Sequence, residues 1–207
     1  IEKGAPAPDV RSRQPSPTVA MTTEDIFRRI VDAMGRAGIP YMLTGSFASS
    51  YHGIPRATQD IDFVIAPTEH QLRHMISLLP DTEYYISEEA ALEALAREGQ
   101  FNVIDFATGW KIDLIIRKSR AFSSTEFERR LAVDLFGVQL FIASPEDVLL
   151  AKLEWAKAGE SVRQLEDCAN ILRACWDELD RSYLEHWVAQ LGLEGQWQHA
   201  KKIAAAP

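Results

Sequence analysis

Two aspartates separated by one residue are the first feature of the sequence that could do chemistry. Asp60 and Asp62 flank Ile61 at the start of the apolar run 61–65. In a β-strand, residues two apart point the same way, so both carboxylates would share one side while Ile61 faces the core. At about 6.5 Å and an effective dielectric of about 20, the two charges repel by about 2.5 kcal/mol. The pattern favours either a bound hard cation such as Mg²⁺ or a solvated strand edge.

A third carboxylate, Asp113, lies in the middle of the apolar run 112–116. A charge within an apolar strand is costly unless something pairs it. A metal ion shared with Asp60 and Asp62 would pair it, and so would a salt bridge to Lys111 or to an arginine elsewhere. The sequence leaves both partners open.

Gly45 and Ser46 stand between an apolar strand pattern and a run of small residues typical of a helix. A helix N-terminus has unpaired N–H groups and a partial positive charge, and a preceding glycine lets a phosphate approach the backbone. Ser46 could add its hydroxyl to such a phosphate site, or it could simply cap its helix.

Hydrophobic periodicity predicts the elements that position these residues. The predicted strands are 39–43, 61–65, 101–106, 111–116, 131–135 and 138–142. Helices are predicted over 23–38, 46–51, 67–79 (opened by Pro67), 88–98 and nearly everything after Pro145. In that last stretch we expect four tryptophans on apolar, core-facing positions: Trp155, Trp176, Trp187 and Trp197.

These elements predict an α/β fold with a small mixed β-sheet flanked by helices, followed by a helical C-terminal half. The catalytic part would span 21–143 and the helical part 144–207. Four prolines among small and charged residues in 1–20 indicate a disordered leader or an expression remnant.

Composition narrows the class of protein. The chain has 207 residues, of which 46% are hydrophobic and 25% charged, which is typical of a globular protein. A net charge of −8 disfavours nonspecific nucleic-acid binding, and no run is apolar enough to support a membrane role. Cys168 and Cys175, about 10 Å apart on one predicted helix, are too distant for a disulfide and indicate a reducing compartment, the cytoplasm.

In this order, the three motifs resemble the nucleotidyltransferase superfamily built on the polymerase-beta core, over Tyr41 to Ile116. The runs 43–48 and 56–63 are most similar to minimal and toxin-like (abortive-infection type) nucleotidyltransferases of bacteria and archaea. The run 144–147 and the following Lys152 are similar to the second half of those proteins. One glycine precedes Ser46, where many relatives have two.

The resemblance implies transfer of an NMP from an NTP to a hydroxyl acceptor, with release of pyrophosphate. Asp60 and Asp62 would hold a metal ion at the triphosphate, and Asp113 would help bind a second ion and deprotonate the acceptor. Gly45 and Ser46 would grip the β and γ phosphates. Two Mg²⁺ ions are expected, with Mn²⁺ as a possible substitute.

Several flanking residues have two interpretations. Arg56 and Thr58, just before the aspartates, could touch phosphate or hold their loop, and Arg56 could instead pair with a carboxylate. Lys152 could reach the triphosphate, as the resemblance implies, or extend to water from an apolar helix. Arg163 and Asp167 are one helical turn apart and predict a salt bridge.

Histidines add no further site to this prediction. His70 and His74 share a helix face but have no evident third ligand, so we expect them to be exposed. His52 is expected to be partly buried. No Gly-rich loop ending in Gly-Lys-Ser/Thr is present, which argues against a P-loop ATPase.

The acceptor and partners stay open at this stage. RNA or protein would suit a toxin–antitoxin role with a partner antitoxin, and a small molecule such as an antibiotic would suit a cleft between the halves. A non-catalytic nucleotide-binding module and a homo-oligomer are further alternatives.

Overall fold

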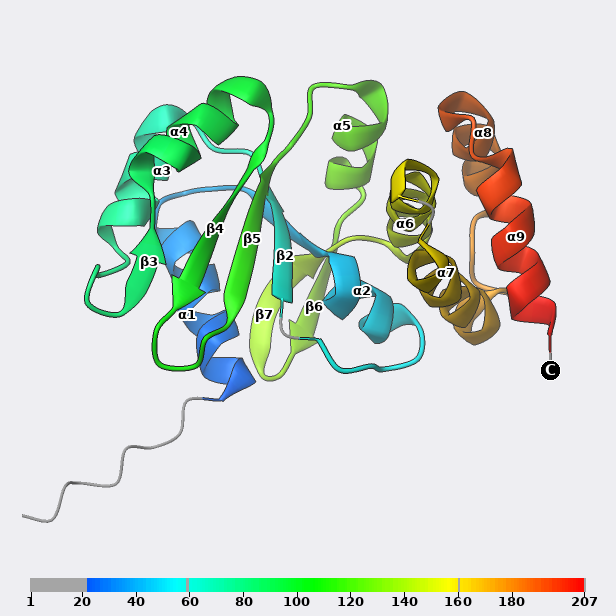
Figure 1. The fold of residues 1–207 in the computed structure, drawn as a ribbon, viewed down its shortest axis with the longest axis horizontal. Coiled ribbons are helices and arrows are strands. Elements are labelled where there is room, and N and C mark those ends of the chain that lie inside the picture. The colour runs from blue at the N-terminus through cyan, green and yellow to red at the C-terminus, as the bar shows by residue number, and fades with distance from the viewer. Residues whose placement is uncertain (1–21, 59, 160, 207) are drawn as a thin grey trace, which may run out of the picture.

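The structure, a computed structural model, describes residues 22–58, 60–159 and 161–206, so the predicted leader 1–20 lies outside it. Its centre is one mixed sheet in the order β3-β4-β5-β2-β1-β7-β6 (Figure 1). The strands are β1 (Tyr41–Thr44), β2 (Asp60–Ile65), β3 (Tyr84–Ile86), β4 (Gln100–Asp105), β5 (Lys111–Ile116), β6 (Leu131–Leu135) and β7 (Val138–Ile142).

Strand pairing decides which side chains become neighbours. β2 lies between β1, to which it is antiparallel, and β5, to which it is parallel. The parallel register sets Asp62 beside Asp113 and Asp60 beside Lys111. β1 also pairs in parallel with β7, while β3–β4, β4–β5 and β6–β7 are antiparallel.

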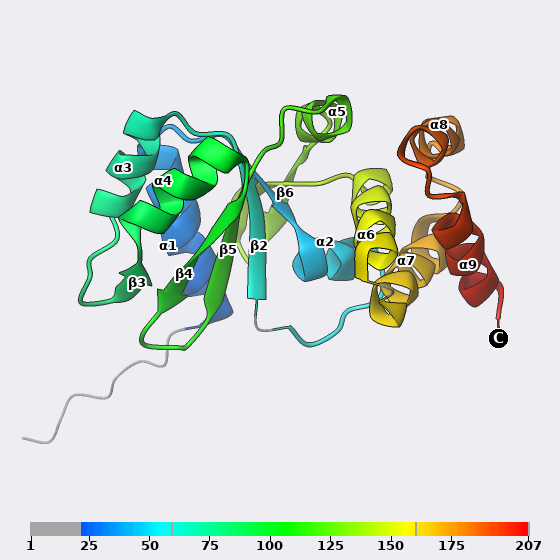
Figure 2. The same ribbon diagram turned by 45° about the horizontal axis from the view of Figure 1, so that its top comes forward.

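Most of the helices form two groups. Figures 1 and 2 show α1, α3 and α4 on one side of the molecule and α2 with α6 to α9 on the other. The bounds are α1 (Thr23–Arg36), α2 (Gly45–His52), α3 (Glu69–Ser77), α4 (Glu88–Arg97), α5 (Ala121–Glu128), α6 (Pro145–Gly159), α7 (Val162–Cys175), α8 (Arg181–Leu191) and α9 (Glu194–Ala205). The predicted α/β class, a mixed sheet flanked by helices and followed by a helical half, is confirmed. The division at 143/144 falls between β7 and α6 and stays a prediction.

Two elements were absent from the prediction, and each has a local reason. β3 has three residues, too few to show a period. α5 contains Ser123, Ser124 and Thr125, which have weak helix propensity, and it buries Phe122 and Phe127 instead. Tertiary burial therefore forms a helix that local preference does not favour.

The start of α3 corrects one expectation. Pro67 was predicted to open this helix, but Thr68 is its N-cap and forms a capping box with Gln71. Two reciprocal side-chain bonds satisfy the first amides of the helix, so the proline stays outside it.

The expectation that the C-terminal tryptophans face the core is wrong for two of them. Trp197 is buried and Trp187 is partly buried against the core. Trp155 is 60% exposed and Trp176 38% exposed, because residue spacing in a helix does not reveal which face packs against the rest of the protein.

Two further observations concern the cysteines and the helix lengths. Cys168 and Cys175 are free thiols. No described helix is both long and apolar enough to cross a membrane.

Candidate functional site

The turn from β1 into α2 is built around Gly45. Its φ of +65° lies in the left-handed region, and a Cβ at this position would stand 2.0 Å from Asp62 Oδ2. Only glycine fits both constraints, which brings the start of α2 against the Asp62 carboxylate.

Ser46 does not cap α2. The N-cap is Thr44, which makes no side-chain capping bond, and the Asp62 carboxylate instead accepts a hydrogen bond from the Ser46 backbone N–H of this eight-residue helix. The Ser46 hydroxyl instead accepts a hydrogen bond from Arg56 Nη2 at 2.6 Å. The simple capping interpretation of Ser46 is therefore wrong.

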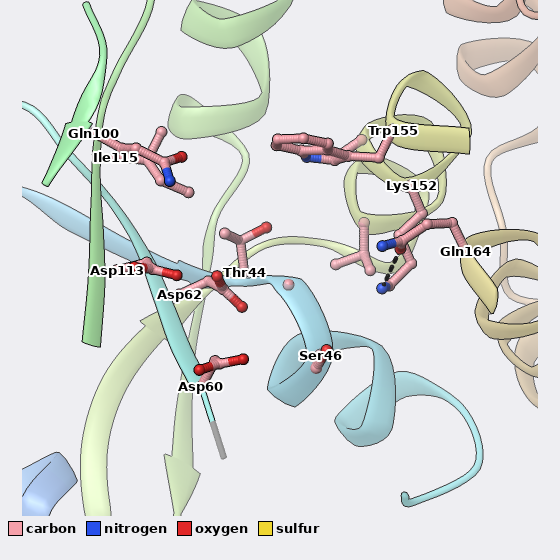
Figure 3. Close-up of a pocket in the computed structure, with 13 residues that line it drawn as sticks. Thr44, Ser46, Asp60, Asp62, Gln100, Asp113, Ile115, Lys152, Trp155 and Gln164 are labelled. Atoms are coloured by element: carbon pink, nitrogen blue, oxygen red, sulfur yellow. Dashed lines mark hydrogen bonds between the residues drawn. The ribbon is translucent and has the colours of Figure 1, made fainter. Parts of the chain in front are cut away.

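Asp60, Asp62 and Asp113 form one face of a cavity, which we call the strand wall (Figure 3). Ile61 and Phe63 are fully buried on the opposite side of β2, as the alternation predicts. The pKa of the Asp62 carboxyl is raised, mainly by burial and further by repulsion from Asp113 and Asp60. A hydrogen bond from the Ser46 backbone N–H acts in the opposite direction but is outweighed. The three carboxylates thus share one side of adjacent strands at an electrostatic cost.

Lys111 partly relieves this cost. Its Nζ lies 2.8 Å from Asp113 Oδ2 and 3.8 Å from Asp60 Oδ1. The predicted alternative of a salt bridge to Asp113 is therefore present in the structure. Within the described residues, no three carboxylate, imidazole or thiol groups converge as a ready-made metal cage.

The opposite face of the cavity is formed by Lys152 on α6 and Gln164 on α7. We call these two residues, together with Asp167 of α7 behind them, the helix wall. Lys152 is 4% exposed, and its Nζ donates to Asp167 Oδ2 at 2.7 Å and to Gln164 Oε1 at 2.9 Å. It does not extend to water, because a buried carboxylate holds it.

Asp167 binds a second cation. Arg56 donates to Oδ1 from Nε at 2.9 Å and to Oδ2 from Nη2 at 3.0 Å. Burial would raise the pKa of Asp167, but the hydrogen bonds from Arg56 and Lys152 outweigh it and lower the pKa. The expected Arg163–Asp167 salt bridge is wrong, since Asp167 points inward to partners distant in the sequence.

The two walls border a partly open cavity of about 270 Å³. Its lining comprises Thr44, Gly45, Ser46, Asp60, Asp62, Gln100, Asp113, Ile115, Val148, Ala151, Lys152, Trp155 and Gln164. Of the predicted site residues, Arg56 and Thr58 do not line it. Arg56 reaches it through Ser46, and Thr58 Oγ1 instead accepts from the Asp60 backbone N–H at 3.4 Å.

Sequence reasoning missed Asp167, Gln164 and Trp155. Asp167 follows Arg163 by one helical turn, so the sequence predicted this local salt bridge and gave no sign of the distant partners Arg56 and Lys152. His70 and His74 are exposed, and His52 is partly buried with Nε2 2.8 Å from the Ala143 carbonyl oxygen, as expected.

We compared the sequence and the structure with those of known proteins. No family model and no curated protein matches the sequence. The solved structure of ANT(2″)-Ia in complex with adenylyl-2″-tobramycin matches with a TM-score of 0.55 at 12% identity, over 86% of this chain and 99% of that one. The chain has the nucleotidyltransferase fold.

Two further structures agree with the nucleotidyltransferase fold. The solution structure of the antibiotic-resistance factor ANT(2″)-Ia matches with a TM-score of 0.51 at 14% identity, over 85% of this chain and 97% of that one. An antigenic nucleotidyltransferase-like protein from Paracoccidioides brasiliensis matches with a TM-score of 0.50 at 15% identity, over 84% and 91%. At these identities the likeness concerns the fold.

Proposed function

We propose that the protein transfers a nucleotidyl group from an NTP to a hydroxyl acceptor and releases pyrophosphate. One observation carries the proposal: the Gly45 turn touches Asp62 in a cavity that also contains Asp60, Asp113 and Lys152. A phosphate-binding helix start and a cluster of hard oxygen ligands are the two parts that this chemistry needs.

The residues present fit Mg²⁺ ions. Asp60, Asp62 and Asp113 offer carboxylate oxygens only, and the Lys111 ammonium already acts as a counter-cation between two of them. When bound, two Mg²⁺ ions (or Mn²⁺) would neutralise phosphate charge and stabilise the attacking and leaving oxygens.

The chain's own groups would orient the triphosphate. The first amides of α2 and the Ser46 hydroxyl would donate to the β and γ phosphates. Lys152, on the helix wall, would supply positive charge, while Asp167 fixes Arg56 against Ser46. Thr58 would hold the loop that leads into Asp60.

Asp113 would act on the acceptor. The acceptor oxygen attacks the α-phosphorus, the bond from that phosphorus to the pyrophosphate oxygen breaks, and the hydroxyl proton passes to the Asp113 carboxylate. The Asp113 side chain is only 13% exposed, so water competes poorly for this position.

A small-molecule acceptor is the second candidate. It is favoured by the cavity between the two walls, which is of a size suited to small molecules, and by the adenylyl-tobramycin complex of the ANT(2″)-Ia structure. An RNA or protein acceptor, a toxin–antitoxin role, a homo-oligomer and a cytoplasmic location stay predictions.

Label transfer tests the proposed function. The protein would be incubated with Mg²⁺ and each α-labelled NTP in host lysate, beside an Asp60→Ala/Asp62→Ala variant. A matched Asp81→Ala/Asp177→Ala variant, altered at exposed aspartates, serves as the control. We expect label in one acceptor fraction with the intact protein and the control only. Equal transfer by all three proteins, or no transfer and no NTP binding, would refute the function.

A further inference from the structure

A second cavity of about 300 Å³ adjoins the first one. Both are lined by Thr44, Ile115, Ala151 and Trp155, so they are contiguous. Nucleotidyl transfer needs two ligands in contact, the NTP and its acceptor. The first cavity contains the groups suited to the triphosphate, which leaves the second for the other reactant.

β5 connects the two cavities. Asp113, Ile115 and Arg117 alternate onto the same side of this strand, since the Arg117 N–H continues the sheet by donating to the Ile65 carbonyl oxygen at 2.8 Å. The Cα atoms of Asp113 and Arg117 are therefore about 13 Å apart. A ligand lying along β5 could present a hydroxyl to Asp113 and its far end to Arg117.

The charges of the second cavity differ in sign from those of the strand wall. Arg120 is neutralised by Glu154, which accepts from Nη1 at 2.6 Å and from Nη2 at 2.5 Å. Arg117 and Lys118 form no ion pair with any described residue, and Arg117 Nε is buried without a hydrogen-bond partner. The nearby Glu98 carboxylate accepts from the Ser119 N–H and does not line the cavity.

Glu126, the remaining carboxyl of this cavity, does not offset these cations. Burial, followed by repulsion from Asp147, raises its pKa to about 8, so it is mostly protonated at neutral pH. Arg117 lies with its Cζ 5.6 Å from the Phe127 ring centroid, and Glu98 outside the cavity attracts both cations. Neither Arg117 nor Lys118 has an ion pair among the described residues, so an anion in the cavity is a natural partner for them.

An aromatic wall completes the second cavity. Trp155 projects from α6, is 60% exposed and lies across from Ile115 (Figure 3). An exposed indole beside cations is the arrangement that binds nucleotide bases by stacking while holding phosphate.

We infer that the second cavity is the acceptor site and that the acceptor is an anionic, ring-bearing hydroxyl compound with the chemistry of a nucleotide unit. Its hydroxyl meets Asp113, its ring packs between Trp155 and Ile115, and its phosphate meets Arg117 and Lys118. A free nucleotide and the 3′ end of an RNA share this chemistry. The inference rests on the proposed function and gives the site an acceptor opposite in charge to a polyamine such as tobramycin.

Titration calorimetry separates this inference from the proposed function. A first titration measures binding of a non-hydrolysable NTP analogue with Mg²⁺, which tests the donor cavity alone. Adenosine 5′-monophosphate, adenosine, tobramycin and a short single-stranded RNA are then titrated into protein saturated with the analogue, and also into protein without it. The second series reports on the acceptor cavity even if the analogue does not bind.

We expect adenosine 5′-monophosphate to bind about tenfold more tightly than uncharged adenosine, and tobramycin to bind more weakly than the nucleotide. Lys118→Glu, at an exposed position, should weaken nucleotide binding about tenfold, and Trp155→Ala by a similar factor. Lys202→Glu on α9 makes the same charge change far from the cavity and should have no effect. Tighter binding of the RNA than of the mononucleotide would identify a strand end as the source, and the reverse would identify a free nucleotide.

Three results would overturn the inference. Tobramycin could bind more tightly than the nucleotide, or Lys118→Glu could act no more strongly than Lys202→Glu. Alternatively, Lys118→Glu could weaken the NTP analogue instead of the acceptor, which would assign the second cavity to the donor base.

Discussion

The strand wall and the helix wall of the candidate site differ in how their carboxylates are neutralised. On the strand wall, Asp60, Asp62 and Asp113 crowd together, and one lysine bridges two of them. On the helix wall, Asp167 is bonded by both Arg56 and Lys152, so its charge is satisfied within the protein. The carboxylates of the strand wall are therefore only partly neutralised within the protein, whereas the Asp167 carboxylate of the helix wall has two cationic partners.

This difference separates residues that bind from residues that position. Like charges beside one another cost free energy, so a carboxylate cluster that one lysine only partly neutralises is suited to binding a cation, as we propose for the strand wall. A buried, fully bonded ion pair instead fixes geometry, and removing one partner leaves the other unsolvated. Substitutions in the two walls should accordingly change stability in opposite directions.

The largest expected effect is on activity, at the strand wall. Asp62→Asn should lower nucleotidyl transfer by about 10³-fold or more, because metal-assisted charge stabilisation is worth several kcal/mol. In metal-free buffer the same variant should unfold at a higher temperature. The folded pKa of Asp62 lies above its ordinary value of 3.8, so its ionisation destabilises the fold as pH rises above that value.

Thermal unfolding with and without Mg²⁺ checks the sign at Asp62, with Asp81→Asn as the exposed control. A lower unfolding temperature for metal-free Asp62→Asn would contradict the idea that the strand wall awaits a cation.

The helix wall should respond in the opposite direction. Asp167→Ala should destabilise the protein by about 3 kcal/mol, because it leaves the buried Lys152 ammonium without its carboxylate. Arg163→Ala, one turn away and exposed, should change the free energy of unfolding by less than about 0.5 kcal/mol. Urea unfolding of the two variants measures both free energies of unfolding. Equal destabilisation by the two substitutions would support an Arg163–Asp167 salt bridge, which is absent from the structure.

Glu126 is a third case. Burial and repulsion from Asp147 raise the pKa of this carboxyl by more than the nearby Arg120 lowers it. Its pKa of about 8 in the fold exceeds the ordinary 4.5, so stability falls as pH rises from 4.5 to about 8. Glu126→Gln removes that loss and should add about 1–3 kcal/mol at about pH 9 and little at about pH 5. Measuring the free energy of unfolding at both pH values tests this prediction, with Glu128→Gln at an exposed neighbouring position as the control. An equal gain in stability at both pH values for Glu126→Gln would contradict the raised pKa.

The smallest effect concerns the bridging lysine. Because Lys111 competes with any cation between Asp60 and Asp113, Lys111→Gln should lower the Mg²⁺ concentration for half-saturation about threefold. Calorimetric metal titration checks this, with Lys202→Gln as the control. Weaker metal binding in Lys111→Gln would assign the lysine to the site itself.

Much of the fold and half of the site could be predicted from local patterns. Ile61 and Phe63 alternate with two aspartates, and this period of two fixed which side of β2 carries charge. The break at Gly45 likewise predicted a turn from strand to helix. β3 and α5 escaped prediction because one is very short and the other forms through burial of Phe122 and Phe127.

The sequence by itself determined that Asp60 and Asp62 share a side and that Gly45 precedes a helix, because both follow from backbone geometry over a few residues. Only the tertiary structure decided that Asp62 meets Asp113, since that depends on the parallel register of β2 and β5. It also decided that Asp167 turns from Arg163 to Arg56, 111 residues away along the chain. Ion pairs and stacking surfaces form wherever folding brings charges and rings together, and no local period encodes that meeting.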